Sequence, residues 1–339
     1  MVSMKDIARD CGVSIATVSK ALNDYSDIGE ATREKVRRTA DELGYFPNSS
    51  ARALKTKRTF NLGVLLADEA GMGLTHDYFA SVLQSFKVCA EEKGYDINFT
   101  SSNISSRKTS YLEHCRYRGV DGVLIACINF YDPSVQELVL SDLPVVTIDH
   151  VFDNRIAVVS DNVQGIKELV ELVLEKGHRR IAYIHGADSS VTRSRLNSFY
   201  HTLAQHDISV PEEYIGLAAY RDVEAARKET RRLLRLSVPP TCIFYPDDIS
   251  TLGGINAIQG AGLTVGRDIS ICGYDGIFLA NLLQPPLTTV RQNTDEIGRI
   301  AARKLISLIE NPKSTMIERI VVKGTLVPGA SVADIRDML

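Results

Sequence analysis

Residues 3–23 read SMKDIARDCGVSIATVSKALN, and this stretch decides the fold of the N-terminal part of the chain. The spacing of its apolar residues predicts two short helices, at residues 4–11 and 15–22. Gly12 follows the first helix, where a left-handed backbone is needed, and Ser14 can cap the second. The stretch therefore predicts a pair of helices joined by a tight turn.

The second of these helices presents a face of short polar and methyl-bearing side chains. This face comprises Ile15, Ala16, Thr17, Ser19, Lys20 and Asn23. Such groups suit base edges, thymine methyls and phosphates, and a helix pair with a tight turn can place one helix in the major groove of DNA. A third helix is expected at about residues 31–43, ending at Gly44, and its solvent side carries Arg33, Lys35, Arg37 and Arg38. A solvated three-helix bundle without nucleic acid is the alternative.

Length and charge indicate a protein of several domains with a basic N-terminal part. The 339 residues predict two or three domains, no apolar run reaches the length of a membrane span, and the N-terminus lacks a signal-peptide pattern. We therefore expect no membrane contact and a cytoplasmic location. Residues 1–57 hold ten Lys/Arg against eight Asp/Glu, whereas the remainder holds 29 against 34. A basic head on an acidic body fits local contact with DNA.

The residue types that enzymes and metal sites need are scattered along the chain. The six cysteines include no Cys-x-x-Cys pair, and the seven histidines show no metal-ligand spacing. No nucleophile elbow, Walker loop or His-Glu-x-x-His motif is present in the sequence. We expect no enzyme, no metal and no cofactor.

Residues 48–58 predict a hinge between the helical head and the rest of the chain. Residues 50–55 could form barely two helical turns, and a helix that short is unstable by itself in water. We expect this segment to become helical only when it is held against a partner. Leu54 is an apolar residue beside Arg52 and Lys55, whose charges can neutralise phosphates. A plain linker is the alternative.

From Phe60 onward, apolar strand-like runs alternate with amphipathic helical stretches. This order predicts parallel sheets covered by helices on both faces. The expected strands are residues 61–67, 96–100, 122–127, 145–148, 157–160, 181–185, 241–245 and 270–274. The expected helices are residues 78–93, 163–175, 195–205, 224–236 and 250–260.

Three aspartates lie at the ends of expected strands. They are Asp149, Asp247 and Asp275. Ligands of open α/β sheets bind beyond the carboxyl ends of the strands, so these carboxylates are candidates for a binding site. Each of them could instead cap a helix or lie in a surface turn.

The sequence resembles the lactose/galactose repressor family over nearly its whole length. The resembling segments are residues 4–8, 12–14, 16–19, 32–36, 43–48, 51–54, 177–182, 268–275 and 286–290, together with Asn23. The resemblance implies a homodimeric DNA-binding transcriptional regulator, expected to be a repressor, whose affinity for a pseudo-palindromic operator is set by a small molecule. The implied fold is α plus α/β, with a three-helix helix-turn-helix head, a hinge helix and a two-lobed periplasmic-binding-protein-like body.

The resemblance also implies the domain limits. The head would span residues 1–47, the hinge 48–58, the body 59–329 and a tail 330–339. Lobe 1 would take residues 59–156 and 291–318, and lobe 2 residues 157–290 and 319–329. The short tail with Pro328 and Gly329 discourages the extra C-terminal helix of the family's tetramers, so we expect a dimer.

The resemblance names the residues of two sites. For DNA they are Met4, Lys5, Ser14, Ile15, Ala16, Thr17, Ser19, Lys20, Asn23, Ala51, Leu54 and Lys55, with Leu54 as a wedge inserted into the minor groove. For the effector they are Tyr78, Phe79, Asp149, Arg195, Tyr220, Asp247 and Asp275.

The effector set favours a neutral sugar or polyol. Three acids and one arginine can hydrogen-bond vicinal hydroxyls, while aromatic rings cover the apolar face of a sugar. Asp247-Asp248, His150 and Arg221 depart from the family pattern, so the effector's identity stays open. The alternatives are a regulator that senses a nucleobase or a partner protein, and a cytoplasmic or exported sugar-binding protein without a DNA function.

Overall fold

The computed structural model describes residues 2–23, 25–46, 53, 57–67, 73–104 and 107–336. The chain divides into two compact units, at residues 1–59 and 60–339. Among the described helices, none has the length and apolar character that crossing a bilayer requires.

The first unit holds the predicted helix pair and its third helix. The helices are α1 (Met4–Cys11), α2 (Ile15–Leu22) and α3 (Glu30–Glu42). Gly12 ends α1 with φ 66°, and Ser14 caps α2 by accepting a hydrogen bond from the Thr17 amide at 3.0 Å. Apolar side chains from all three helices form one small core: Ile7, Ala8, Cys11, Val18, Ala21, Val36 and Ala40. The local turn chemistry therefore confirms the predicted helix pair.

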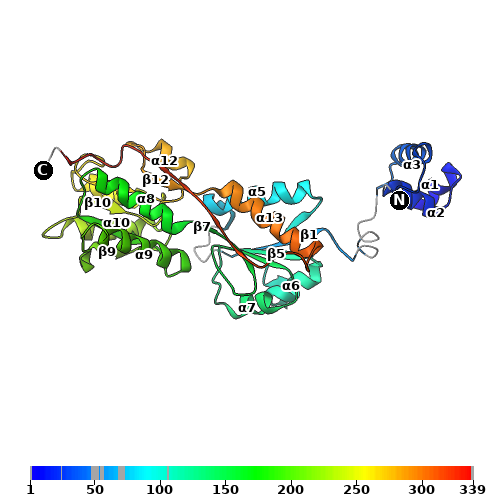
Figure 1. Cartoon of the computed structure of the whole chain (residues 1–339), viewed down its shortest axis with the longest axis horizontal. Coiled ribbons are helices and arrows are strands. Elements are labelled where there is room, and N and C mark those ends of the chain that lie inside the picture. The colour runs from blue at the N-terminus through cyan, green and yellow to red at the C-terminus, as the bar shows by residue number, and fades with distance from the viewer. Residues whose placement is uncertain are drawn as a thin grey trace. The chain divides into compact units, whose positions relative to one another are not determined.

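The second unit contains two lobes, each a parallel sheet between helices (Figure 1). In lobe 1 the strand order is β13-β7-β6-β5-β1-β2. Its strands are β1 (Asn61–Leu66), β2 (Asp96–Phe99), β5 (Gly122–Ala126), β6 (Val145–Ile148), β7 (Ile156–Ser160) and β13 (Arg319–Val322). One face carries α5 (Asp77–Glu92) and α13 (Thr294–Glu310), and the other carries α6 (Tyr111–Arg118) and α7 (Pro133–Leu140). A short hairpin of β3 (Asn103–Ile104) and β4 (Arg107–Lys108) and the 3-10 turn η1 (Gly73–Thr75) complete this lobe.

Lobe 2 repeats the plan with a smaller sheet. Its strand order is β11-β10-β8-β9, and the strands are β8 (Ile181–His185), β9 (Ile215–Leu217), β10 (Cys242–Phe244) and β11 (Ser270–Cys272). The helices α8 (Asn162–Glu175) and α9 (Ser190–Ala204) cover one face, and α10 (Val223–Leu234) and α11 (Thr251–Gly260) cover the other. The remaining elements are η2 (Glu212–Tyr214), α12 (Phe278–Leu282), β12 (Thr289–Arg291) and β14 (Thr325–Val327), with β12 and β14 paired antiparallel.

The limits between the lobes differ from the predicted ones. Strand β7 pairs with β6, and β13 pairs with β7, so residues 157–160 and 319–322 lie in the sheet of lobe 1 and not in lobe 2. The reason is that β7, buried on both faces, needs a neighbour on each side, and β13 supplies the second. The segment from residue 330 is also no free tail, because Val332 packs into the lobe 2 core and Ser331 Oγ donates to the Ile271 carbonyl at 2.7 Å.

Candidate effector pocket and DNA interface

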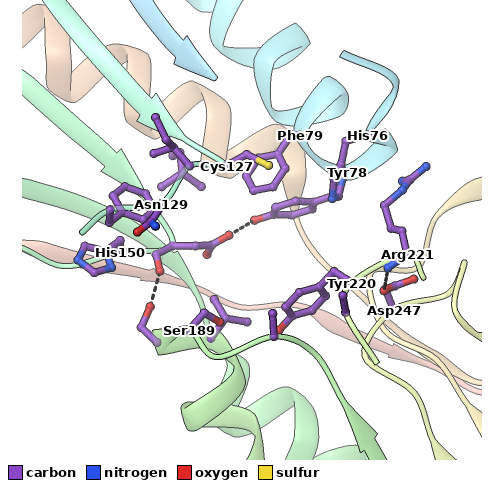
Figure 2. A pocket seen from close by; sticks show the side chains of 18 of the residues that line it. His76, Tyr78, Phe79, Cys127, Asn129, His150, Ser189, Tyr220, Arg221 and Asp247 are labelled. Atoms are coloured by element: carbon purple, nitrogen blue, oxygen red, sulfur yellow. Dashed lines mark hydrogen bonds between the residues drawn. The ribbon is translucent and has the colours of Figure 1, made fainter. Parts of the chain in front are cut away.

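A cavity of about 500 Å³ lies in the body where the strand ends of both lobes face each other (Figure 2). All seven residues that the sequence predicted for an effector line it: Tyr78, Phe79, Asp149, Arg195, Tyr220, Asp247 and Asp275. Tyr78 and Phe79 come from the first turn of α5, and Arg195 comes from α9. The three aspartates follow β6, β10 and β11, as expected for a ligand site beyond the carboxyl ends of the strands.

Asp149 lies on the lobe 1 side of the pocket and is held from two directions. The Tyr78 hydroxyl donates to its Oδ2 at 2.9 Å, and the Ser160 amide donates to its Oδ1 at 3.3 Å. Burial raises the pKa of Asp149, although these two donors oppose the shift. From lobe 2, Ser190 Oγ donates to the Asp149 backbone carbonyl at 2.8 Å, which joins the two lobes across the pocket.

Arg195 is the central cation of the lobe 2 side, and it is almost fully buried. Its Nε donates to Asn162 Oδ1 at 2.7 Å, and Nη1 donates to the Pro246 carbonyl at 2.8 Å. Its guanidinium lies 3.5 Å from the centre of the Tyr274 ring, a close cation–π contact, and its Nη2 is 3.9 Å from Asp275 Oδ1. Burial acts to lower the pKa of Arg195, but the tyrosines and Asp275 around it keep that pKa above its ordinary value.

Asp275 connects the two sides of the pocket through Gln292. Gln292 Nε2 donates to Asp275 Oδ1 at 2.6 Å, and Gln292 Oε1 accepts from Ser160 Oγ. Ser160 in turn donates its amide to Asp149, so a hydrogen-bonded path runs from one carboxylate to the other. Burial raises the pKa of Asp275 to about 6, and Arg195 opposes this shift. Asp275 therefore changes its charge close to neutral pH.

The carboxylate of Asp247 is largely occupied by hydrogen bonds within the protein, although the N-cap of α11 is Ser250. Its Oδ1 accepts from the Ser250 amide at 2.8 Å, and its Oδ2 accepts from Ser250 Oγ at 2.9 Å and from the Arg221 amide at 2.7 Å. A carboxylate offers about four acceptor positions, so roughly one stays available to a ligand. Asp247 lines the pocket, but most of its acceptor positions hold the backbone of the loops at Arg221 and Ser250.

Several wall residues were not in the predicted set. An aromatic cluster lies on the lobe 1 side, where the rings of Phe130 and His150 stack at 4.3 Å and 6°. The other unpredicted polar or aromatic wall residues are His76, Asn129, Tyr131, Asp188, Ser189, Ser190, Arg221 and Gln292. Asn129 and Phe130 follow β5, so the strand-end rule could have found them. Arg221 and Gln292 lie in loops, and only tertiary structure brings them to the pocket.

Backbone strain is concentrated in this wall. Cys127, Asp149, Arg221 and Asp275 have φ values of 49°, 59°, 64° and 100°, in the left-handed region that side chains with a Cβ rarely adopt. Such strained residues cluster at binding sites in proteins. The pocket therefore combines carboxylates, a buried arginine and aromatic rings on a fixed backbone, which suits a small ligand rich in hydroxyl groups.

The head presents α2 as its candidate DNA-reading surface. Ser14, Ile15, Ala16 and Asn23 are exposed, and Thr17, Ser19 and Lys20 are half-buried. On α1, Lys5 is exposed and Met4 is half-buried. The apolar side chain of Ile15 is 44% exposed at the start of α2, a position suited to a thymine methyl. Ala51, Leu54 and Lys55 lie outside the described residues.

Two basic residues of the head have partners within the protein that the sequence did not predict. Lys20 Nζ bonds Asp27, which raises the pKa of the lysine and occupies the charge expected to face DNA. Arg33 is not on a solvent face: its Nη2 donates to the carbonyls of Tyr25 and Ile28, both at 3.1 Å. The reason is that the loop between α2 and α3 needs a donor for its carbonyls, and Arg33 supplies it. Lys35 is exposed, as expected, and its Nζ donates to the Cys11 carbonyl at 3.0 Å.

No cluster of three or more His, Cys, Asp or Glu residues that could hold a metal ion occurs within the described ranges. The carboxylates of the pocket are instead bonded to tyrosine, serine, glutamine and arginine side chains or to backbone amides. The chemistry of the site is therefore that of hydrogen bonding to a neutral or weakly charged ligand.

The helix-turn-helix head and the two-lobed pocket define a DNA-binding transcriptional regulator with an effector domain. Residues 3–48 match the family model of bacterial regulatory proteins of the lacI family, and residues 170–332 match a periplasmic binding protein-like domain. The chain is 31% identical over 325 residues to a probable HTH-type transcriptional repressor, ExuR, of Bacillus subtilis, which covers 95% of each chain. The chain belongs to the LacI family.

Solved structures agree with this assignment over the full length. The Lac repressor dimer bound to operator and the anti-inducer ONPF matches with a TM-score of 0.80 at 25% identity, covering 98% of this chain and 99% of that one. A complex of the transcriptional regulator CelR with cellobiose matches with a TM-score of 0.70 at 26% identity, covering 98% and 100%. These comparisons confirm the predicted fold, a DNA-reading head followed by a two-lobed α/β body.

Proposed function

We propose that this chain is a homodimeric transcriptional repressor whose operator affinity is controlled by a neutral sugar bound between the lobes of its body. The observation that carries the proposal is the convergence of all seven predicted effector residues on one cavity of about 500 Å³. A cavity of this size accommodates a mono- or disaccharide. The CelR–cellobiose complex, a relative with the same two-lobed body, supports a sugar as the class of effector.

The sugar's hydroxyls would bind the two sides of the cleft. Asp149 and Asp275 would accept hydroxyl protons, and the aromatic rings of Phe79, Phe130 and Tyr220 would cover the apolar faces of the ring. The groups lie on different lobes, so a bound sugar stabilises one relative position of the lobes. An allosteric coupling of this kind amounts to ~1–3 kcal/mol.

In the head, α2 would enter the major groove. Ile15, Ala16, Thr17, Ser19 and Lys20 would contact bases and adjacent phosphates, helped by Met4, Lys5, Ser14 and Asn23. The hinge residues Ala51, Leu54 and Lys55 would contact the operator centre, with Leu54 as the wedge. The Lac repressor dimer on its operator supports two heads on two half-sites. Such a regulator works in the cytoplasm, where it meets DNA, and releases its effector chemically unchanged.

A thermal-shift panel on the purified protein tests the effector class. Neutral mono- and disaccharides, sugar phosphates, nucleobases and nucleosides would be compared, because a ligand that binds the native state raises Tm. A shift with a neutral sugar that is lost in Asp275→Asn supports the proposal. A shift only with nucleobases or phosphates contradicts the sugar assignment while leaving the regulator intact.

Three further measurements test the rest of the proposal. Selection from random duplex DNA should recover a pseudo-palindrome whose binding changes when the sugar is added. Light scattering should give a dimer, and a tetrameric mass would contradict it. Mass spectrometry of the recovered ligand should show the sugar unmodified, since conversion would indicate an enzyme.

A further inference from the structure

Arg221 lines the pocket and contacts both lobes. Its guanidinium bonds Asp77 of lobe 1, and its backbone amide bonds Asp247 of lobe 2. The effector site proposed above does not include it. It belongs to lobe 2, in the loop between β9 and α10, and its φ is 64°. Its Nη1 donates to Asp77 Oδ2 at 3.0 Å, and its Nη2 lies 3.4 Å from the Thr75 carbonyl. Both partners precede or begin α5 of lobe 1.

The third donor of the guanidinium is buried and has no hydrogen-bond partner. Arg221 Nε has almost no exposed surface and meets no acceptor, although the arginine lines the pocket. A buried donor without an acceptor is costly, so an acceptor supplied by a bound molecule would stabilise this corner of the pocket. The arginine side chain itself is only 11% exposed, so bulk water does not easily satisfy it.

The charges around Arg221 restrict what that acceptor can be. Asp77 already balances the guanidinium, and Asp247 lies beside it, accepting the Arg221 amide at 2.7 Å. This corner of the pocket therefore has one positive and two negative groups, which disfavours an anionic ligand. A hydroxyl fits, because it can accept from Arg221 Nε and donate to the remaining acceptor position of Asp247.

We propose that Arg221 is a specificity-determining residue of the cleft, which binds a hydroxyl of the neutral effector through Nε while its Nη groups hold lobe 1 through Asp77. This inference rests on the sugar effector proposed above. It assigns to one side chain both the recognition of the ligand and the closure of the lobes. Occupation of Nε fixes the guanidinium plane, and this plane also sets the geometry of the Asp77 pair.

Different variants of the full-length protein test ligand recognition and lobe closure separately. Arg221→Lys keeps a cation for Asp77 but has no second donor at the Nε position, because an ammonium is a point charge without the planar fork. Asp77→Asn weakens the contact with lobe 1 but leaves Nε in place. Arg193→Lys is the matched control, since Arg193 also reaches from lobe 2 to lobe 1, at 3.5 Å from the Tyr131 hydroxyl, without lining the pocket.

Affinity is measured by calorimetry with D-ribose, D-glucose, cellobiose and D-glucuronate as probes. For each neutral sugar that binds the wild-type chain, Arg221→Lys should weaken binding on the order of tenfold to a hundredfold, the range for a lost hydrogen bond to a charged group. Asp77→Asn should weaken it less, and Arg193→Lys should leave it unchanged. Equal affinity in Arg221→Lys and wild type overturns the recognition role. Tighter binding of D-glucuronate than of the neutral sugars, lost in Arg221→Lys, overturns the neutral hydroxyl in favour of a carboxylate.

Closure is measured without any ligand, so that its outcome is independent of the effector proposal. Spin labels on p-acetylphenylalanine would replace Tyr117 in lobe 1 and Leu217 in lobe 2, both well exposed, and pulsed EPR would give their distance in labelled chains diluted with unlabelled ones. Asp77→Asn should broaden this distance distribution, and Arg221→Lys and Arg193→Lys should not. An unchanged distribution in Asp77→Asn overturns the closure role. Failure of all four probes to bind wild type overturns the hydroxyl assignment together with the proposed sugar effector, while the EPR result still decides closure.

Discussion

The affinity of the cleft for its effector should fall as the pH drops below about 7. The cause is Asp275, whose pKa is raised to about 6 by burial against the opposing effect of Arg195. Hydroxyl donors from a sugar favour the ionised carboxylate, so the pKa of Asp275 is lower in the complex than in the free protein. The proton and the effector therefore compete, so affinity rises with pH through 6 and becomes level above about pH 7.

The expected magnitude follows from that pKa. At pH 6 about half of the free protein carries the proton, so each binding event releases roughly half a proton. At pH 5 roughly nine-tenths of the free protein is protonated, and the affinity is about tenfold below its plateau. The pKa of Asp149 is also raised by burial, which adds to the effect in the same direction.

Calorimetry between pH 5 and pH 8 measures both quantities. Titrations in buffers with different ionisation enthalpies give the number of protons released, and Asp275→Asn should reduce this number and flatten the pH dependence. A constant affinity across the range, or a full pH slope in Asp275→Asn, would refute the reasoning.

The raised pKa of Asp275 also affects the stability of the folded chain when no effector is bound. The folded-state pKa of Asp275 lies above that of an unfolded aspartate, so the folded chain binds more protons between roughly pH 4 and pH 6. The free energy of unfolding should therefore decrease as the pH rises through this window.

Three other predictions concern packing and DNA binding. Gly253→Ala should destabilise the folded chain by about 2 kcal/mol, which corresponds to a decrease in Tm of roughly 4–8 °C in calorimetry. The added Cβ would lie 2.0 Å from the Val223 carbonyl oxygen, where α10 crosses α11, and this clash outweighs the gain in helix propensity from alanine. An unchanged Tm would contradict this contact. Lys20→Gln should reduce, by about one, the slope of the logarithm of operator affinity against the logarithm of salt concentration. Asp27→Asn should increase operator affinity, because it frees Lys20 from its ion pair. Fluorescence anisotropy at several salt concentrations measures both effects. Leu54→Ala should keep the fold but weaken operator binding and bending, and an unchanged bend angle would count against the wedge.

The head was predictable from the sequence because its determinants are local. Ser14 caps α2 and Gly12 ends α1 within a few residues of where each acts, and the predicted bounds of both helices agree with the structure. The ion pair of Lys20 with Asp27 was not predictable, since it depends on how the loop after α2 folds back on that helix.

The body was predictable as a pattern but not in its pairing. The strong apolar runs predicted eight strands that the structure contains, including the three-residue strands β10 and β11, which are buried throughout. Strands β9 and β12 are equally short but end in exposed residues, so their apolar pattern is too weak to be recognised. The placement of β13 in lobe 1 depends on its pairing with β7, between residues about 160 positions apart, which no local signal encodes.

In the candidate pocket, too, residues placed by local sequence were predictable and residues placed by tertiary contacts were not. Its aspartates were found because they follow strands, and ligands of open α/β sheets bind beyond the carboxyl ends of the strands. Arg221 and Gln292 were missed because loop geometry and contacts with the other lobe bring them there. The seven predicted effector residues remain predictions for ligand binding until a ligand is measured.

The left-handed backbone at Cys127, Asp149, Arg221 and Asp275 limits how this pocket can change its ligand over evolution or in the laboratory. At such φ values, only glycine, asparagine and aspartate are readily tolerated, so most exchanges at these four positions would disturb the loop as well as the contact. New specificity is therefore expected to arise first at wall residues with ordinary backbone, such as Asn129. A library for a redesigned biosensor should diversify positions of that kind and leave the four strained ones fixed.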